Sequence, residues 1–259
     1  PCKFLIRNVE GNLLELLDLV ALGTVCDVVT LVNENRANVY WGLQVMHRTR
    51  RPGIRALAAV TGLKTEELQA RSLGFVLGPH LNAAGRLETA QLSLDLLTAS
   101  DSMQALEIAY RLHDMNGARR TEQDRIAREA SLQAEQFAAQ PVLVLSDASW
   151  SHGIIGIVAA KMLERYGKPT FVLQEMGAES KGSARSYGDF SAVDAIHAAE
   201  QWLTKGGGHK LAAGVTLPTD NIPKFREAVN DFYHSLKLSD QLHYLQPRAD
   251  ADVSDFMHL

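Results

Sequence analysis

The sequence predicts an α/β protein in two parts, joined by one long helix. Three observations support this prediction. The first hundred residues carry mostly helical patterns of apolar residues. Residues 102–137 contain no proline and one glycine, and good helix formers dominate their second half. From residue 141 onward, short apolar runs alternate with amphipathic helical patterns, which is typical of strand–helix–strand units.

The helical part is expected to contain several helices of ordinary length. Gly23 is the expected end of the first helix, and Pro52 opens the third. The glycine-rich stretch 73–87 predicts a loop with a short helix, and an interruption of the long helix at Asn116–Gly117 stays open. A strand-like apolar run at 4–9 comes before all of them. The expected helices cover residues 13–22, about 36–48, 53–61, about 88–98 and 102–137.

The second part is expected to hold a sheet with helices. A strand at 141–146, a helix closed by Gly167 and a strand at 169–174 form a unit whose two strands are parallel. The short stretch 181–186 is a strand or a turn. The remaining expected elements are a helix at 191–203, a glycine-rich turn running into a strand at 206–217, and a helix at 222–236.

Composition narrows the class of protein. The chain has 259 residues, of which 46% are hydrophobic and 22% charged, which excludes a disordered or low-complexity protein. No run of about 18 apolar residues is present, so we expect no membrane-spanning helix and no membrane partner. Cys2 and Cys26 are too few for a disulfide framework or a four-cysteine zinc site. A cytoplasmic location fits best.

The charge balance argues against a protein that coats nucleic acid by bulk charge, because the formal net charge is −4. It does not exclude a local basic channel. Arginines cluster in two stretches, which could also be solvated helix faces. These are Arg48, Arg50, Arg51 and Arg55, and then Arg119, Arg120, Arg125 and Arg128.

Asp27 is a candidate for chemistry because it ends an apolar stretch between Cys26 and Val28. An ionised carboxylate in apolar surroundings is costly unless it is paired or binds a metal. Pairing with a nearby backbone group or an arginine is the structural alternative.

The string KGSARS is a candidate phosphate clamp. Gly182 permits close approach, and Ser183 and Arg185 would lie on one face of a strand because they are two residues apart. A serine hydroxyl and a guanidinium both donate hydrogen bonds to phosphate. An edge strand with a surface arginine is the structural alternative.

The string GGGHKLAAG is the most unusual in the chain. Consecutive glycines cost conformational entropy, and Gly207 and Gly208 are explained if backbone amides approach a ligand. His209 would then lie in a turn. A flexible hinge with a hydrogen-bonded histidine is the alternative.

Further polar groups interrupt small-residue or helical stretches. They could contact a ligand or simply be structural, and Trp150 and His152 precede a helix whose N-terminus could receive an anion. The candidates among them are His80, Asn82, Arg86, Asn116, Arg119 and Arg120. No P-loop, nucleophile elbow or dinucleotide fingerprint is present.

Taken together, these strings resemble a known family. LDLVALGTVCDVVTL, LGFVLGPHLNAAGRL, SHGIIGIVAAKML, KGSARS and GGGHKLAAG occur in the order found in the RecJ family of exonucleases, within the DHH/DHHA1 phosphoesterase superfamily. The resemblance runs from about residue 12 to about residue 217. It implies the C-terminal part of a DHH domain at 1–100, a connector helix at 101–140, a DHHA1 substrate-binding domain at 141–236, and a linker with the start of an OB-type domain at 237–259.

The resemblance also implies an activity: 5′–3′ digestion of single-stranded DNA in repair and recombination, with two Mn²⁺ or Mg²⁺ ions. Asp27 resembles a metal ligand of the fourth DHH motif, and no Asp-His-His string supplies the others, so this chain alone is expected to be inactive. The partners implied are single-stranded DNA with a 5′ end and a single-strand-binding protein or helicase.

By the same resemblance, the 5′ phosphate binds residues of the second part and the strand passes residues of the first. The first group is Gly182, Ser183, Arg185, Gly207, Gly208 and His209, and the second is His80, Asn82, Arg86, Arg119 and Arg120. Two alternatives stay open. One is a phosphoesterase acting on short oligonucleotides or cyclic dinucleotides, and the other is a non-catalytic nucleic-acid-binding protein.

Overall fold

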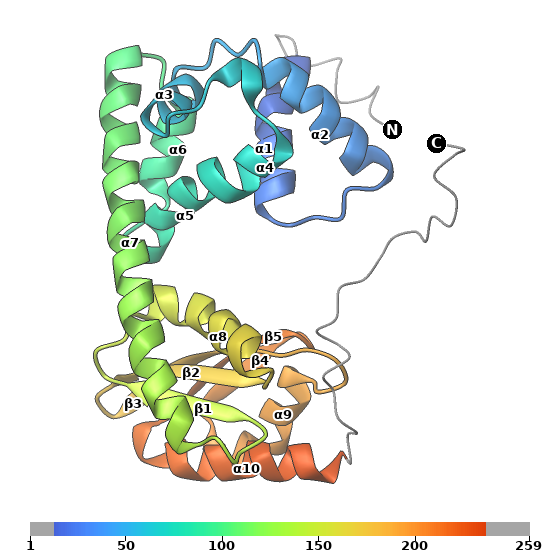
Figure 1. The fold of residues 1–259 in the computed structure, drawn as a ribbon, viewed down its shortest axis with the longest axis vertical. Helices are drawn as coiled ribbons and strands as arrows, with labels where there is room; N and C mark the ends of the chain where they lie inside the picture. Colours follow the sequence, from blue (N-terminus) through green and yellow to red (C-terminus); the bar gives the residue numbers. More distant parts are fainter. Residues whose placement is uncertain (1–12, 237–259) are drawn as a thin grey trace. The chain divides into compact units, whose positions relative to one another are not determined.

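The computed structural model describes residues 13–236, which divide into two compact units between Thr121 and Glu122. We call residues 13–121 the helical unit and residues 122–236 the sheet unit. One helix, α7 (Ser102–Gln136), contributes its first half to the helical unit and its second half to the sheet unit (Figure 1). The fold is therefore α/β with a long helix, as the sequence predicts.

The helical unit packs its helices around one apolar core. Met46, Leu57, Leu77, Leu96 and Leu112 are all buried in this core. The α-helices of this unit are α1 (Leu17–Cys26), α2 (Asn33–Met46), α3 (Pro52–Val60), α4 (Ala70–Ser72), α5 (Gly78–Leu87), α6 (Gln91–Thr98) and the first half of α7. Short helical turns at Leu13–Leu16, Thr65–Glu67 and Leu73–Leu77 lie between them.

Two expectations about this unit are wrong in detail. Gly23 does not end the first helix, since α1 continues to Cys26 and Asp27 caps it. The stretch 73–87 is helical throughout, not a loop. Its small residues serve packing: a Cβ atom on Gly78 would lie 2.6 Å from Cys26 Sγ. Glycine commonly signals irregular backbone, whereas here it lets two elements approach.

Two smaller differences concern helix limits. The helix expected at about 88–98 is α6, which begins three residues later, at Gln91. The long helix passes through Asn116 and Gly117 without a break, so the interruption is excluded. The apolar run at 4–9 and the expected OB-type start at 237–259 lie outside the described residues.

The sheet unit contains five strands in the order β1-β2-β3-β5-β4. β1 and β2 are parallel, as predicted, and all other pairs are antiparallel. Gly167 ends α8 in a left-handed conformation (φ 62°), which is the expected helix stop. The strands are β1 (Leu143–Asp147), β2 (Thr170–Met176), β3 (Glu179–Arg185), β4 (Lys205–Gly208) and β5 (Ala212–Pro218).

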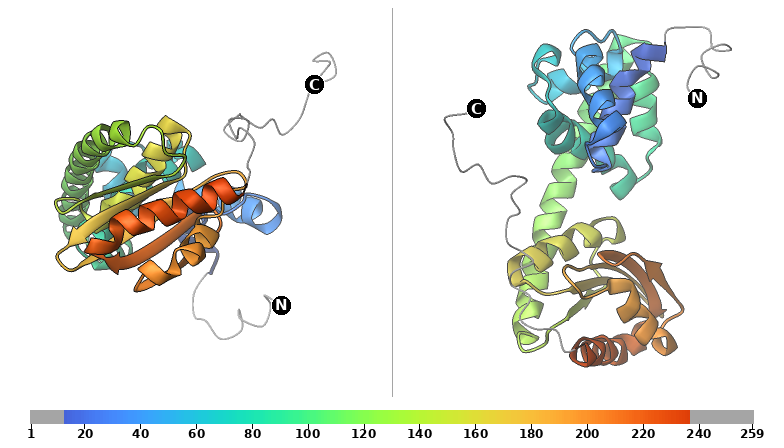
Figure 2. Two further views of the ribbon diagram at one scale, coloured as in Figure 1. Left: turned by 90° about the horizontal axis from the view of Figure 1, so that it is seen from below. Right: turned by 90° about the vertical axis from the view of Figure 1, so that its right-hand side faces the viewer.

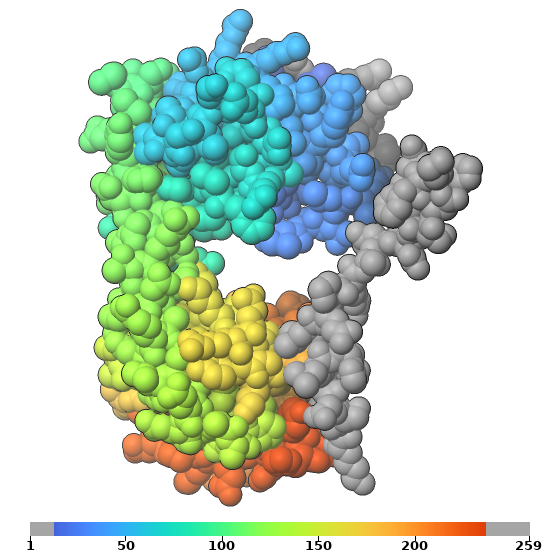
Figure 3. Space-filling model, viewed as in Figure 1, coloured from blue at the N-terminus to red at the C-terminus, as the bar shows by residue number. Residues whose placement is uncertain are grey.

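Helices lie on both faces of this sheet (Figure 2). On one face, α8 (His152–Tyr166) and the second half of α7 pack against alternate residues of β1 and β2, such as Leu145 and Val172. On the other face, α9 (Ala192–Ala198) and α10 (Ile222–Ser235) cover a core that includes β5. Figure 3 shows the yellow surface of α8 beside the green surface of α7.

The glycine-rich stretch 206–209 differs from its prediction. Gly206, Gly207 and Gly208 are not a turn but lie in β4, paired with β5, and the turn begins at His209. Of the helices in residues 13–236, none is both long and apolar enough to span a membrane.

Candidate phosphate-binding face

The side chains of Ser183 and Arg185 project from β3 to the same face of the sheet, the one that α8 partly covers. A Cβ atom built on Gly156 of α8 would lie 3.4 Å from both Ser183 Oγ and an Arg185 terminal nitrogen. Gly182 and Ala184, which alternate with them, are buried on the opposite face. The alternation predicted for this strand is confirmed, and it brings a hydroxyl and a guanidinium together beneath a helix.

A row of small residues continues this face across the sheet. Ser183 pairs with Gly214 of β5, and Gly214 pairs with Gly207 of β4. A Cβ atom on Gly207 would meet nothing within 4 Å, and one on Gly214 would meet only a carbonyl oxygen at 3.7 Å. The packing of the unit therefore does not require glycine at these two positions, and the surface above them is open enough for a ligand to reach the strand backbone.

The other glycines of the motifs have a structural explanation. A Cβ atom on Gly182 would lie 2.8 Å from Leu173 Cγ, and one on Gly206 would lie 2.5 Å from Ile196 Cγ2. Gly208 has a φ of 147°, and a Cβ there would lie 2.5 Å from Ala213 Cα. Packing alone therefore explains the glycines at 182 and 208, for which ligand contacts were predicted. It does not explain Gly207.

His209 lies in the turn between β4 and β5, where its side chain is exposed. Its backbone amide donates a hydrogen bond to Ala212 O at 2.8 Å, which closes the turn. The imidazole is therefore presented next to the end of the glycine strand, as the sequence predicts.

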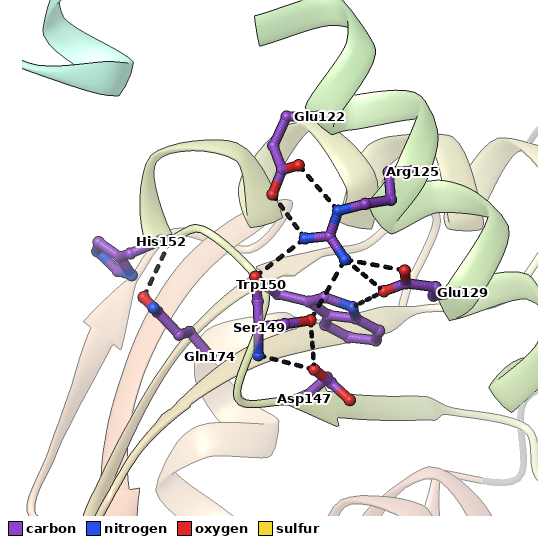
Figure 4. A network of polar contacts seen from close by, with 8 residues as sticks. All are labelled: Glu122, Arg125, Glu129, Asp147, Ser149, Trp150, His152 and Gln174. Atoms are coloured by element: carbon purple, nitrogen blue, oxygen red, sulfur yellow. Dashed lines mark hydrogen bonds and ion pairs between the residues drawn. The ribbon is translucent and has the colours of Figure 1, made fainter. Parts of the chain in front are cut away.

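A polar network fixes the loop before α8 (Figure 4). Arg125 of α7 donates to both oxygens of Glu122 and both oxygens of Glu129, and it also bonds Ser149 O at 3.0 Å. The indole nitrogen of the fully buried Trp150 donates to Glu129 at 2.9 Å. These bonds hold the β1–α8 loop against α7.

This network orients the start of α8. His152 is the first residue of α8 and is exposed, and its backbone amide donates to Gln174 Oε1 at 3.0 Å. The sequence identifies Arg125 only as part of an arginine cluster. The spacing of Glu122, Arg125 and Glu129 could have indicated an ion-pair ladder on one helix face.

In the helical unit, His80 belongs to a polar network with α7. Its Nδ1 lies 2.7 Å from Val76 O, so Nδ1 carries the proton and Nε2 accepts from Asn116 Nδ2 at 3.3 Å. Asn116 Oδ1 in turn accepts from Arg119 Nε at 3.1 Å. Burial lowers the pKa of His80, and the positive charges of His113, Arg120 and Arg119 lower it further, against the effect of the Val76 hydrogen bond.

The predicted residues of this unit therefore fall into two groups. His80, Arg119 and Arg120 lie together around the network, while Asn82 and Arg86 lie elsewhere on α5. Asn82 is exposed. Arg86 is half-buried, and burial lowers its pKa.

Asp27 lies at the end of α1, where it is exposed and not, as predicted, in apolar surroundings. The desolvation argument for this residue is therefore wrong within the described chain. No group of three or more His, Cys, Asp or Glu residues that could hold a metal ion occurs in residues 13–236. These residues alone do not fit a metal centre, and Asp27 can supply one ligand at most.

A hollow of about 1330 Å³ lies in the helical unit, and none of the residues predicted to bind metal or substrate lines it. Its wall includes the buried Asp18, which accepts hydrogen bonds from Arg51 Nε at 3.0 Å and from an Arg51 terminal nitrogen at 3.3 Å. Arg51 from the first arginine cluster is thus a structural partner of Asp18, while Arg48 and Arg50 are exposed.

Comparison with known proteins assigns the class of the sheet unit. Residues 139–235 match the family model described as the DHHA1 domain. The chain therefore contains a DHHA1 domain, which includes β1 to β5, α8, α9 and α10.

Longer matches identify the relatives. The chain is 37% identical over 221 residues to the single-stranded-DNA-specific exonuclease RecJ of Bacillus subtilis, and 38% identical over 233 residues to that of Dickeya dadantii. These matches cover 84% and 86% of this chain but only 28% and 40% of the relatives. The crystal structure of RecJ from Thermus thermophilus in complex with Mn²⁺ superposes with a TM-score of 0.79 at 35% identity, covering 86% of this chain and 33% of that one. This chain is therefore a RecJ homologue that spans about a third of the length of its relatives.

Proposed function

We propose that this chain is the substrate-binding part of a metal-dependent 5′–3′ exonuclease specific for single-stranded DNA, acting in DNA repair and recombination. The observation that carries the proposal is the row formed by Ser183, Gly214 and Gly207, with Arg185 beside it on the same face. A terminal phosphate can accept hydrogen bonds from the hydroxyl and the guanidinium there, because the glycines leave space above the strands. Homology to RecJ supports the choice of single-stranded DNA as the ligand.

The site would bind a 5′ end by charge and shape, without reading bases. Arg185 offers a planar donor fork, and the exposed His209 adds a further donor at the end of β4. In the helical unit, Asn82, Arg86, Arg119 and Arg120 would contact the strand backbone. Such contacts give affinity without sequence preference, and the affinity falls as salt rises. His80, predicted with them, is buried and uses both ring nitrogens within the unit, so it would support Arg119 through Asn116 and not touch the strand.

Hydrolysis requires more than the described residues supply. Crystal structures of RecJ have been determined with Mn²⁺ and with Mg²⁺, and such ions lower the pKa of a bound water. Asp27 would contribute one carboxylate ligand, a donor that suits these cations. We therefore propose that the chain by itself binds substrate and does not cleave it.

The decisive experiment measures binding of a single-stranded oligonucleotide that carries either a 5′ phosphate or a 5′ hydroxyl, by fluorescence anisotropy. The wild-type chain should prefer the phosphate, and Arg185→Gln and Ser183→Ala should lose that preference. Lys224→Gln, on α10 at the opposite face, is the control and should keep it. Equal binding of both ends by the wild-type chain would contradict the proposal, and tighter binding of a cyclic dinucleotide would favour the small-substrate alternative.

A further inference from the structure

A second row of polar side chains lies next to the proposed phosphate site, on the same face of the sheet. Lys181 of β3 pairs with Thr216 of β5, and Thr216 pairs with Lys205 of β4. The three residues therefore lie side by side across three neighbouring strands. Neither lysine forms a side-chain hydrogen bond or ion pair with another residue of 13–236.

The direction of each side chain follows from its neighbours. Lys181 is two residues from Ser183 and shares its face. Thr216 lies between Val215 and Leu217, which are buried in the core on the α9–α10 face, so Thr216 points the other way. A Cβ on Gly206 would contact Ile196 of α9, so Lys205, the adjacent residue, points away from α9.

The spacing of the two rows matches a nucleic-acid backbone. Two residues along a strand span roughly 7 Å, close to the separation of successive phosphorus atoms in an extended single strand. Across the strands, the Cα atoms of Lys181 and Lys205 are roughly 10 Å apart, so both ammonium groups can converge above Thr216. The Thr216 hydroxyl adds a donor between them.

The charged groups around this row limit what it can bind. Glu179 lies two residues before Lys181 on the same face of β3 and is exposed. Asp147 lies two strands away, with Gln174 between it and Lys181. The Asp147 carboxylate accepts two hydrogen bonds from Ser149, which lower its pKa. The carboxylate of Glu179 therefore ends the basic strip along β3.

We infer that Lys181, Thr216 and Lys205 form a second phosphate subsite, which binds the phosphate next to the 5′-terminal one. The inference rests on the proposed function, since it takes the terminal phosphate to lie at Ser183 and Arg185. It makes the preferred ligand an oligonucleotide with at least two phosphates, and it disfavours a mononucleotide.

The test uses the 259-residue chain and two ligands, thymidine 5′-phosphate (pT) and the 5′-phosphorylated dinucleotide pTpT, with affinities measured by calorimetry at low salt. The wild-type chain should bind pTpT about tenfold more tightly than pT, because two charged donors meet the second phosphate. In the double variant Lys181→Gln/Lys205→Gln, the affinity for pT should stay within about twofold and the gain for pTpT should disappear. The double variant Lys64→Gln/Lys224→Gln removes the same charge elsewhere and should keep the gain.

A longer ligand gives an independent readout. With a 5′-phosphorylated oligonucleotide of about 12 nucleotides, the slope of log affinity against log salt should be smaller by about 0.7 in Lys181→Gln/Lys205→Gln, which corresponds to one phosphate that is no longer neutralised. No gain for pTpT in the wild-type chain, or a gain that survives in this double variant, overturns the inference. Failure of the proposed function shows itself differently, as unchanged binding of pT by Arg185→Gln.

Discussion

The two units use their polar residues in opposite ways. In the helical unit, hydrogen bonds join His80 to Asn116 and Asn116 to Arg119, and both His80 and Asn116 are buried. In the sheet unit, Ser183 and Gly207 lie in register on a face that the glycines leave open. Both groups of residues look unusual in the sequence, but the polar residues of the helical unit are explained by their bonds to one another. Gly207 has no such explanation, which is why it points to a ligand.

The largest expected effect is a difference in stability between alanine variants of two neighbouring glycines, Gly207 and Gly208. Gly208→Ala should destabilise the chain by about 3 kcal/mol, because the new Cβ would collide with Ala213 and the φ of 147° is unfavourable for alanine. Gly207→Ala should change stability by less than about 0.5 kcal/mol, because nothing lies within 4 Å. Urea unfolding of both variants measures the difference, and similar losses would remove the distinction between packing and ligand glycines.

Variants of Gly207 and Arg185 test ligand binding, because neither change should unfold the chain. Gly207→Ala should weaken binding of a 5′-phosphorylated oligonucleotide, while Arg185→Gln should weaken it by about tenfold to a hundredfold, the cost of losing a charged donor. Anisotropy titrations give both values. Unchanged affinity in both variants, with the fold intact by circular dichroism, would place the ligand elsewhere.

Breaking the hydrogen bonds between His80, Asn116 and Arg119 should lower the stability of the helical unit. Asn116→Ala removes the donor to His80 and the acceptor for Arg119 at a position that is 2% exposed, and should cost about 2 kcal/mol. The exposed Asn82→Ala is the matched control and should cost less than about 0.5 kcal/mol. Thermal unfolding compares the two, and an equal cost would show that the hydrogen bonds of Asn116 do not stabilise the fold.

The smallest expected effect is a dependence on pH. The pKa of His80 is lowered in the folded chain from its ordinary value of 6.5, mainly by burial, so below pH 6.5 the unfolded chain binds a proton more readily than the folded chain does. Stability should therefore fall as the pH falls below about 6.5, and the fall should be shallower in His80→Leu. Urea unfolding between about pH 8 and pH 5 gives the slopes, and identical slopes would contradict the assignment.

The first strand–helix–strand unit of the sheet unit could be predicted because local signals agree there. Apolar runs mark β1 and β2, and Gly167 ends α8 as its position indicates. The helical turn before α5 could not be predicted, since Gly78 is explained by packing against the distant Cys26 and against Leu73 O, which the sequence does not reveal. The same limit applies to the site. Sequence alone selects Gly207 and Gly208 together, and only the space around each Cβ position and the φ of Gly208 separate them.

The bonds of Arg125 and Glu129 bear on how the DHHA1 domain can be isolated. The family match begins at residue 139, but Ile126, Ala130 and Ala134 of α7 fill the core beneath α8. A fragment cut at residue 139 would expose that core and leave the indole of Trp150 without its carboxylate partner. The smallest piece expected to fold alone therefore starts near Glu122, and a protease that trims the chain should stop there.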